Sequence, residues 1–319
     1  MNFNMRIAIL GAAGFIGTNL TFNILSQYKN VKLTLFDRNK KNFQKEILEH
    51  DNVEVIEFDF DYNGKFDSIV ENQDVVFHLI STTVPTTSNQ HISDELMNNV
   101  VTTSKLLESC VKAKVKRVIF LSSGGTVYGT DCICPIKEED NTNPITAYGI
   151  QKLTIEKLLH LYKSMYKLDY KVIRLANPYG PYQKPNGVLG AVTTFTQKAI
   201  NGENIILYGD GSVIRDFIYI DDAIKGIVNI AFDDSDEHIF NLGSGEGTSI
   251  KELIQKINEA LDLKLNITYK PKRNVDVPVN YLDVSKYENL YGKAQSISLV
   301  EGIIKTANYL ENISRKVII

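Results

Sequence analysis

The stretch Arg6-Ile-Ala-Ile-Leu-Gly-Ala-Ala-Gly-Phe-Ile-Gly17 decides the fold. Its apolar run predicts a buried strand, and the glycines at 11, 14 and 17 then open a segment with helical spacing, 18–28. A strand, glycine turn and helix present free backbone N–H groups and a helix N-terminus, which together bind a pyrophosphate. The spacing G-x-x-G-x-x-G departs from the usual G-x-G-x-x-G, so we expect a variant of the dinucleotide-binding turn.

A second apolar strand, 31–36, ends in Asp37, which is about 20 residues after Gly17. In a dinucleotide-binding unit, a carboxylate at this place accepts hydrogen bonds from the adenosine ribose. A 2′-phosphate would meet a like charge there, so Asp37 favours NAD over NADP, and Arg38 weakens this preference without reversing it. Three glycines alone also fit an ordinary tight turn, but the strand, helix and acid together favour a dinucleotide site.

The first half of the chain alternates strands and helices. Strands are expected at 6–10, 31–36, 53–58, 75–80, 117–122 and 170–175, with long helices at 15–28, 94–113 and 146–163. This alternation predicts an α/β fold, a doubly wound parallel sheet of the Rossmann type. Ligands of such sheets bind at the carboxyl ends of the strands. We therefore expect Asp59 and Phe60 beside the adenine and 79–81 at the same edge, with His78 as a packed strand-end residue.

After Asn177-Pro-Tyr-Gly-Pro181 the pattern becomes irregular. Helices are expected at 190–201, 221–232 and 249–261, strands at 214–220 and 239–241, and a turn at 209–211. The interrupted alternation predicts two domains. An NAD-binding domain would comprise 1–178 and about 214–243, and a smaller interleaved C-terminal α/β domain that binds the substrate would comprise 179–213 and 244–319.

Composition narrows the class of protein. The 319 residues carry a net charge of −3 without a strongly basic stretch, so no nucleic-acid partner is expected. We find no signal peptide and no apolar run near the ~18 residues that cross a bilayer, so we expect no membrane partner. The three cysteines fit a reducing cytoplasm. Cys132 and Cys134 form a C-x-C that could hint at a metal, but without a second pair we expect loop cysteines and no metal.

Tyr148 and Lys152 are the first candidates for chemistry. Residues four apart share one face of a helix, so the phenol and the ammonium can meet at one site. Free tyrosine titrates near ~10, and a neighbouring cation favours the phenolate, which can take a proton from an alcohol and later return it. The alternative for this pair alone is an amphipathic helix with a surface lysine.

A set of motifs in fixed order indicates a family. In sequence they are Gly11–Gly17, Asp37, Asp59-Phe60, Asn98-Asn99, Ser122-Ser-Gly-Gly-Thr-Val-Tyr-Gly129, Tyr148 with Lys152, Asn177–Pro181 and Arg215-Asp-Phe217. Over nearly its whole length the chain resembles the extended short-chain dehydrogenases/reductases of the NAD-dependent epimerase/dehydratase family, most of all the UDP-glucose 4-epimerase branch.

The resemblance implies roles for particular residues. Tyr148 would be the acid/base, and Lys152 would bind the nicotinamide ribose and lower the tyrosine pKa. The residues expected to contact NAD are Gly11, Gly14, Phe15, Ile16, Gly17, Asp37, Arg38, Asp59, Phe60, Leu79, Ile80, Ser81, Asn99, Ser122, Tyr148 and Lys152. Those expected to contact the nucleotide sugar are Ser123, Asn177, Arg215, Arg273 and Asp276. A guanidinium binds phosphate oxygens bidentately, which suits Arg215 and Arg273, although a surface arginine is the alternative for Arg273 and a structural pair with Asp216 fits equally beside Arg215.

One position departs from the family pattern. Many epimerases have a serine or threonine four residues before the tyrosine of the V-Y-G motif, and this chain has Gly124. The hydroxyl that binds the sugar oxygen would then come from Ser123 or Thr126. We favour Ser123, because Gly124-Gly125 can bend the backbone freely to re-aim it. Dehydratases of the family need an acid and a base at these two glycines, so dehydration is disfavoured.

The expected activity is NAD-dependent 4-epimerisation of a nucleotide sugar through a transient 4-keto intermediate. The substrates would be UDP-glucose and UDP-galactose or their N-acetyl equivalents. The alternative enzyme is an NAD(P)H-dependent reductase of a 4-keto nucleotide sugar. A non-catalytic nucleotide sensor is a third hypothesis, but a sensor has no need of the Tyr148–Lys152 pair. The resemblance also implies a homodimer formed through the helices at 94–113 and 146–163.

Overall fold

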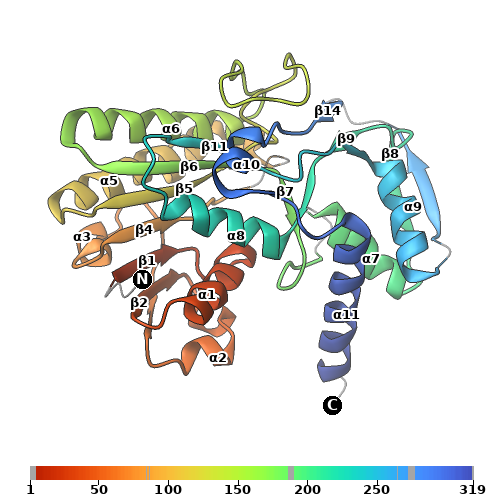
Figure 1. Cartoon of the computed structure of the whole chain (residues 1–319), viewed down its shortest axis with the longest axis horizontal. Helices are drawn as coiled ribbons and strands as arrows, with labels where there is room; N and C mark the ends of the chain where they lie inside the picture. The colour runs from red at the N-terminus through yellow and green to blue at the C-terminus, as the bar shows by residue number, and fades with distance from the viewer. Residues whose placement is uncertain are drawn as a thin grey trace.

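The computed structural model describes residues 5–83, 85, 87–185, 190–263, 265–271 and 277–317. Its largest element is a parallel sheet with the strand order β11-β6-β5-β4-β1-β2-β3 (Figure 1). These strands are β1 Met5–Leu10, β2 Val31–Asp37, β3 Val53–Glu57, β4 Val75–His78, β5 Arg117–Ser123, β6 Asp169–Leu175 and β11 Ile239–Leu242. The predicted doubly wound parallel sheet is confirmed.

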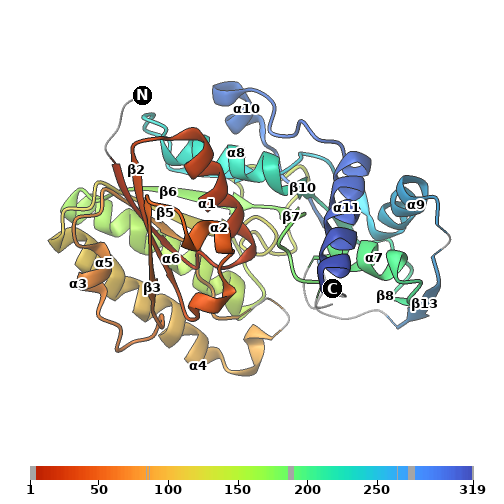
Figure 2. The ribbon, with the colours of Figure 1, turned by 90° about the horizontal axis from the view of Figure 1, so that it is seen from below.

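Alternation along β1 explains why helices cover both faces of this sheet. Ile7 and Ile9 belong to one buried cluster, together with residues of the helices α1 Phe15–Gln27 and α8 Ile220–Ala231. Ala8 and Leu10 belong to another, with residues of α3 Phe66–Val70, α5 Thr102–Lys112 and α6 Ala147–Tyr166. Successive side chains of a strand point to opposite faces, and a strand that is apolar on both must be buried on both. Figure 2 shows the two helix layers with the sheet between them.

The long helices of the large sheet lie close to their predicted places, whereas two short ones, α2 and α3, were not predicted. They are α1 Phe15–Gln27, α2 Lys45–Leu48, α3 Phe66–Val70, α4 Ile92–Glu95, α5 Thr102–Lys112, α6 Ala147–Tyr166 and α8 Ile220–Ala231, with short 3₁₀ turns η1 Lys40–Asn42 and η2 Ser88–Gln90. Between α4 and α5 the chain forms a π-helical segment, η3 Leu96–Val101. The helix expected at 94–113 is therefore one helical run with a widened turn inside it.

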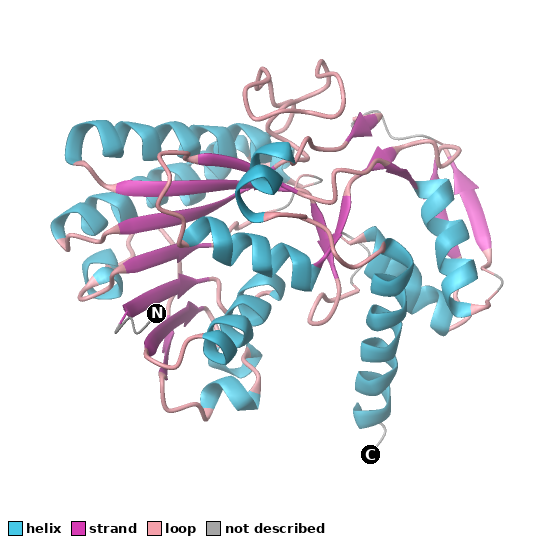
Figure 3. Ribbon diagram, in the orientation of Figure 1, coloured by secondary structure: helices cyan, strands magenta, loops and turns pink. Residues whose placement is uncertain are grey.

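The second half of the chain builds a smaller group of elements beside the sheet (Figure 3). They are β7 Asn177–Tyr179, α7 Ala191–Ile200, β8 Ile205–Tyr208, β9 Ile214–Arg215, β10 Phe217–Tyr219, β12 Thr248–Ser249, α9 Ile250–Leu261, β13 Ile267–Lys270, β14 Val279–Asn280, α10 Ser285–Tyr291 and α11 Leu299–Val317. The small sheets pair β10 with β7, β9 with both β12 and β14, and β13 with β8. The strand expected at 214–220 is in fact two short strands, which Asp216 separates.

The order of the strands fixes where a ligand can bind. From β1 the chain builds outward through β2 and β3, then crosses back to place β4 on the other side of β1. A crevice forms at such a reversal, outside the carboxyl ends of the strands. Gly11 follows β1 and Leu79 follows β4 at this edge, where the Leu79 N–H donates to the Leu10 carbonyl at 3.1 Å. In the described part of the chain, no helix is long and apolar enough to cross a membrane.

Candidate active site

The glycine turn is shaped for close approach of a ligand. Gly11 has a φ of +84°, which favours glycine, and a Cβ on it would lie 3.2 Å from Ile80 Cγ1. A Cβ on Gly17 would lie 2.4 Å from the Gly11 carbonyl oxygen, so only glycine lets α1 start this close to the turn. Among the described side chains, none caps α1 at Gly14, which leaves the N-terminus of this helix open to an anion.

Asp37 lies at the end of β2, beside this turn. Its Oδ2 accepts a hydrogen bond from the Ala13 N–H at 3.1 Å, and its Oδ1 accepts one from the Arg38 N–H at 2.8 Å. The carboxylate is half-buried, and each oxygen retains a lone pair for a ribose hydroxyl. The turn, the open helix end and this acid together fit a dinucleotide with a free 2′-hydroxyl.

The other residues expected around the adenine and the nicotinamide lie along the same edge. Asp59 is exposed two residues after the end of β3, whereas the Phe60 ring is buried against Phe66 and His78. Phe60 therefore contributes to the core as well as to this edge. His78 is buried and bonded to Thr103 at 2.9 Å, and burial, with the charge of Lys152, lowers the pKa of His78 to about 3. His78 is thus a neutral packed residue, as predicted.

Tyr148 and Lys152 lie on one face of α6, at the edge of the sheet. Lys152 Nζ lies 5.6 Å from the centre of the Tyr148 ring and 4.7 Å from that of Phe120. The lysine is 3% exposed, and its Nζ donates to the Leu121 carbonyl at 2.8 Å. Lys152 is therefore not the surface lysine that the motif alone allowed. The phenol and the ammonium share one site.

The chain's own groups do not make this phenol acidic. Burial raises the pKa of Tyr148 to about 12, and a hydrogen bond with Ser81 offsets this only in part. Burial also lowers the pKa of Lys152 to about 7, against the opposing charge of Glu156. That Lys152 lowers the tyrosine pKa when NAD is bound stays a prediction, because burial sets the pKa of Tyr148 in the protein alone.

Asn99 lies in the π-helical segment η3 and is buried. Its Oδ1 accepts from the Thr82 N–H at 3.1 Å, and its Nδ2 donates to Thr82 Oγ1 at 2.7 Å and to the Glu95 carbonyl at 3.0 Å. Glu95 also accepts from Thr83 Oγ1. Single π-turns frequently occur at functional sites. Here the turn brings an asparagine against the loop that follows β4.

That loop also holds the start of the catalytic helix. The Tyr148 N–H donates to Ser88 Oγ at 3.1 Å, and the Ala147 N–H donates to Asn89 Oδ1 at 2.7 Å. Thr146 caps the same helix through the Gly149 N–H at 3.1 Å. The sequence analysis missed Ser88 and Asn89. Of the α6 caps, only Thr146 leaves a local signal, because it stands directly before the helix.

Ser122 has a different surrounding from the one expected. Its hydroxyl donates to Glu156 Oε1 at 2.5 Å, and the other oxygen of Glu156 accepts from Arg174 Nη2 at 2.7 Å. Arg174 Nη1 also donates to the Tyr128 hydroxyl at 2.9 Å. In the described structure the Ser122 side chain is thus committed to a buried polar network. Contact between Ser122 and NAD stays a prediction.

The sequence offers two hydroxyls as candidates for contact with the sugar, those of Thr126 and Ser123. Thr126 Oγ1 is buried and has no hydrogen-bond partner among the described residues. A Cβ on Gly149 would lie 2.6 Å from the Thr126 carbonyl oxygen, so the glycine after Tyr148 lets this segment pack directly on α6. Ser123 is half-buried at the end of β5.

The residues expected to hold the diphosphate lie on neighbouring short strands. Asn177 is in β7 and its Nδ2 donates to the Asp216 carbonyl at 2.8 Å. Arg215 is in β9 and its Nη1 donates to the Ile214 and Val277 carbonyls at 2.8 and 2.7 Å. The Asp216 carboxylate binds the N–H groups of Ser244 and Leu282. Arg273 and Asp276 lie outside the described residues.

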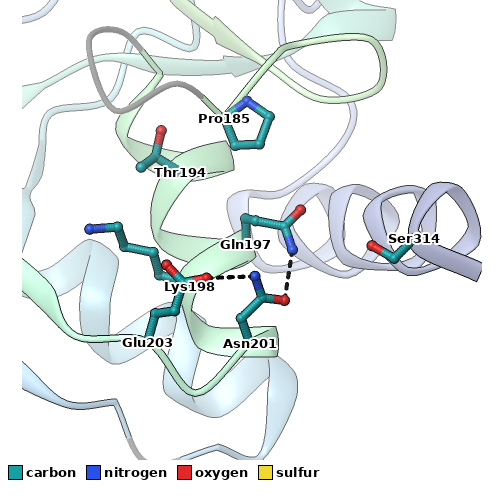
Figure 4. Close-up of a pocket in the computed structure, with 7 residues that line it drawn as sticks. All are labelled: Pro185, Thr194, Gln197, Lys198, Asn201, Glu203 and Ser314. Carbon is teal, nitrogen blue, oxygen red and sulfur yellow. Dashed lines mark hydrogen bonds between the residues drawn. The ribbon is translucent and has the colours of Figure 1, made fainter. Parts of the chain in front are cut away.

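Two polar clefts of the described surface lie elsewhere. One is lined by residues of α7, the following turn and α11 (Figure 4), where Gln197 bonds to Asn201 at 3.1 Å and Asn201 to Glu203 at 2.7 Å. The other includes Arg6 and Lys114, at the opposite edge of the sheet from Tyr148. Neither cleft contains a residue predicted for the site. Cys132 and Cys134 are free thiols, and the described residues gather no group of three or more potential metal ligands.

Comparisons with known proteins agree with this geometry. Residues 7–243 match the model of the NAD dependent epimerase/dehydratase family. A UDP-glucose 4-epimerase of Mycolicibacterium smegmatis is 31% identical over 98% of this chain and 100% of its own length. The chain belongs to the NAD dependent epimerase/dehydratase family.

Solved structures of this kind superpose closely. The UDP-glucose 4-epimerase of Thermotoga maritima, solved with UDP-glucose, is 30% identical with a TM-score of 0.89, over 97% of this chain and 100% of that one. The UDP-glucuronic acid 4-epimerase of Bacillus cereus, solved with UDP-glucuronic acid and NAD, is 25% identical with a TM-score of 0.88, over 97% and 100%. The family and the Rossmann-type fold inferred from the sequence are confirmed.

Proposed function

We propose that this chain is an NAD-dependent 4-epimerase of nucleotide sugars, with UDP-hexoses as substrates. The observation that carries the proposal is the placement of Tyr148 and Lys152 on one face of α6, at the edge where the glycine turn and Asp37 meet. Both solved relatives described above are 4-epimerases of UDP-sugars. We propose the class of UDP-hexoses rather than one sugar, because one of these relatives is a UDP-glucose 4-epimerase and the other a UDP-glucuronic acid 4-epimerase.

Tyr148 would take the proton from the C4 hydroxyl of the sugar. It would return this proton after the 4-keto sugar has rotated to present its opposite face. NAD, when bound, supplies the hydride acceptor for C4 and a positive ring charge that favours the phenolate. Lys152 would bind the nicotinamide ribose, and its charge would favour the same phenolate. Asp37 would accept from the adenosine ribose, and the turn at 11–17 would bind the pyrophosphate.

We propose that the hydroxyl that binds the sugar oxygen is that of Thr126 rather than that of Ser123, which the sequence favoured. A buried hydroxyl without a partner is costly unless a ligand completes it, and Thr126 has that property in the described structure. Thr126→Val, which keeps the shape, should lower kcat about 10²-fold if this bond forms in the transition state. Ser123→Ala should then cost little. The reverse order of the two effects would return the role to Ser123.

The substrate side would be formed by 179–213 and 244–319, with the NAD side formed by 1–178 and about 214–243. Asn177 and Arg215 would hold the diphosphate where these parts meet. Arg273 and Asp276 would complete this contact. We also propose that the enzyme works in the cytoplasm, which its free thiols Cys110, Cys132 and Cys134 fit.

The test is interconversion of UDP-glucose and UDP-galactose, or of the N-acetyl or uronate pairs, by purified protein without added NAD. Tyr148→Phe should lower turnover by about 10²- to 10⁴-fold while the protein stays folded. Full turnover by this variant would overturn the assignment. Net consumption of reduced nicotinamide with a 4-keto sugar would instead identify the alternative, a reductase. Asp37 is compatible with an NADH-dependent reductase.

A homodimer is proposed from the outer face of α4, η3 and α6. Large apolar side chains are exposed there; they include Ile92, Met97, Val101, Ile150, Leu161, Met165 and Tyr166. Such a concentration on adjacent helices marks an interaction surface. Leu161→Glu with Met165→Glu should give a monomer by light scattering. Ile304→Glu, on the exposed side of α11, should leave the mass unchanged.

A further inference from the structure

Glu156 is a buried carboxylate on the catalytic helix that the proposed chemistry does not use. It lies one turn beyond Lys152 and two turns beyond Tyr148, so the three side chains follow one face of α6. Its side chain is 1% exposed. Burying a carboxylate costs several kcal/mol unless other groups compensate it, so its retention at this place needs a physical reason.

The contacts of Glu156 join four segments around the site. Oε1 accepts from Ser122 Oγ at the end of β5, and Oε2 accepts from Arg174 Nη2 on β6. Arg174 in turn donates to the Tyr128 hydroxyl at 2.9 Å and to the Glu138 carbonyl at 3.1 Å. One carboxylate therefore connects α6 to two central strands, and through Arg174 to the segment that carries Thr126.

The same strand end holds Lys152. Its Nζ donates to the carbonyl of Leu121, which directly precedes Ser122. Glu156 thus holds together the two segments that position Lys152. These are α6, from which the lysine extends, and the end of β5, whose Leu121 carbonyl accepts the bond from its ammonium. No other hydrogen bond of Lys152 Nζ occurs within the described residues.

The charges around Lys152 come from several elements. On α6 itself stand the neutral Tyr148 and the anionic Glu156. On β4 stands His78, which is neutral because its pKa is about 3, and on β6 stands Arg174, which is paired with Glu156. On α4, Glu95 is bonded to Thr83 and Asn99. Burial lowers the pKa of Lys152 to about 7, and Glu156 is the group that opposes this shift.

We propose that Glu156 is a positioning residue of the reaction: its carboxylate places a negative charge one helical turn from Lys152 and holds the end of β5 to which the ammonium is bound. This inference rests on the proposed roles of Tyr148 and Lys152. Glu156 touches neither the sugar nor the cofactor, and it acts through the lysine.

Glu156→Gln tests this with little change of shape. Without the negative charge of Glu156, the pKa of Lys152 should fall by about one unit. At any pH above this lowered pKa, a smaller fraction of the protein then carries a protonated Lys152. At about pH 8 the kcat/KM should then be about tenfold below that of the wild type. At about pH 5.5, where Lys152 is protonated in both proteins, the two values should be nearly equal. A purely structural defect would lower activity equally at both pH values.

Control variants separate charge from structure. Tyr128→Phe removes a hydrogen bond from Arg174 but keeps the carboxylate, so it should cost stability without this pH dependence. Glu156→Asp should restore most of the activity at about pH 8. If Glu156→Gln fails to fold, because Arg174 is left buried and unpaired, Glu156→Gln with Arg174→Gln removes both charges and should show a smaller pH-dependent loss in the same direction.

A second measurement does not depend on turnover. The titration of Lys152 Nζ, followed by NMR of ¹⁵N-labelled lysine in the NAD-loaded protein and assigned with Lys152→Met, should have its midpoint about one pH unit lower in Glu156→Gln. An unchanged midpoint would overturn the role of Glu156 even in an active enzyme. A shifted midpoint in a protein without epimerase activity would support that role and refute the proposed function instead.

Discussion

Leu282 occupies the space that a side chain at position 124 would need. A Cβ on Gly124 would lie 2.6 Å from Leu282 Cδ1, and Leu282 is fully buried. The Asn280 amide, from the same segment, donates to the Gly124 carbonyl at 3.2 Å. The glycine at a position where related enzymes have a hydroxyl is therefore matched by a leucine from the C-terminal part of the chain.

This relationship predicts how the two positions respond to mutation. Gly124→Ser should destabilise by about 1–3 kcal/mol, because it overpacks a closed core. Leu282→Ala should cost about 2–5 kcal/mol through the cavity that it leaves. The double variant should lose less stability than the two single variants together, by about 1–2 kcal/mol in the free energy of unfolding measured with urea. Strict additivity would show that the two side chains do not compete for this space.

The caps of α6 carry a second prediction, on positioning of the phenol. Ser88→Ala and Asn89→Ala each remove an acceptor from the first turn and should each cost about 1 kcal/mol. Because the bond to Ser88 is made by the backbone of Tyr148 itself, Ser88→Ala should also lower kcat by about tenfold or more, with a small change in KM.

Thr154→Ala is the matched control for this loss. Its hydroxyl donates to the Ile150 carbonyl at 2.8 Å, farther along the same helix. The change removes a side-chain bond within α6 without touching its first turn, so kcat should stay near that of the wild type. Equal losses in Ser88→Ala and Thr154→Ala would mean that general helix stability, rather than the cap at Tyr148, sets the rate.

A third prediction concerns the burial of Lys152. Replacing this lysine should raise the stability of the fold and abolish the activity. The pKa of Lys152 falls from 10.5 to about 7 because burial penalises the charge. Below pH 7 the folded protein carries this buried ammonium at full cost; the cost declines between pH 7 and 10.5 and is absent above that range. Lys152→Met should therefore abolish turnover yet raise the free energy of unfolding, and by more at about pH 6 than at about pH 9.

Urea unfolding at the two pH values checks this, with Lys157→Met as the reference. Lys157 is exposed on the same helix, so its replacement should change stability little at either pH. If Lys152→Met raises the free energy of unfolding equally at about pH 6 and about pH 9, the removal of a buried charge is not the cause of the gain.

The sequence predicted best where a local pattern and a fixed geometry coincide. The glycine turn, Asp37 and the Tyr148–Lys152 spacing each define a short piece of structure, and the parallel order of the strands follows from their alternation with helices. Residues such as Ser88, Glu95 and Arg174 escaped prediction because their roles depend on contacts across many positions of the chain. Nothing local distinguishes Glu156 from any glutamate on an amphipathic helix.

The C-terminal half was harder to predict, for similar reasons. The helix at 299–317 and the pairing of β8 with β13 were missed, and the strand at 214–220 was wrongly predicted to be continuous. Ile205 pairs with Ile267, and no short-range signal announces a partner so distant in sequence. Asp216 interrupts the apolar run because its buried carboxylate binds backbone N–H groups from two later segments.

A fourth prediction concerns Lys171, which is fully buried on β6. Its Nζ donates to Asp233 Oδ2 at 2.8 Å and to the carbonyls of Ser235 and Glu237 at 2.9 and 2.6 Å. These bonds hold the turn between α8 and β11, at the edge of the large sheet. Lys171→Met keeps the volume but removes the ammonium that pairs with Asp233 and the donor to two carbonyls, so it should cost about 3 kcal/mol.

Lys163→Met provides the contrast. This lysine pairs with Asp169 at 3.3 Å but is about a third exposed, so its loss should cost below about 1 kcal/mol. Burial raises the pKa of the Asp233 carboxyl, but its bonds to Lys171 and Ser235 outweigh this and lower it to about 2. The pair should thus stabilise the fold above about pH 4 and lose this effect as the pH falls through 2. Urea unfolding at neutral pH measures the stability that Lys171→Met and Lys163→Met each lose. Similar losses would show that burial does not set the strength of the ion pairs that these two lysines form.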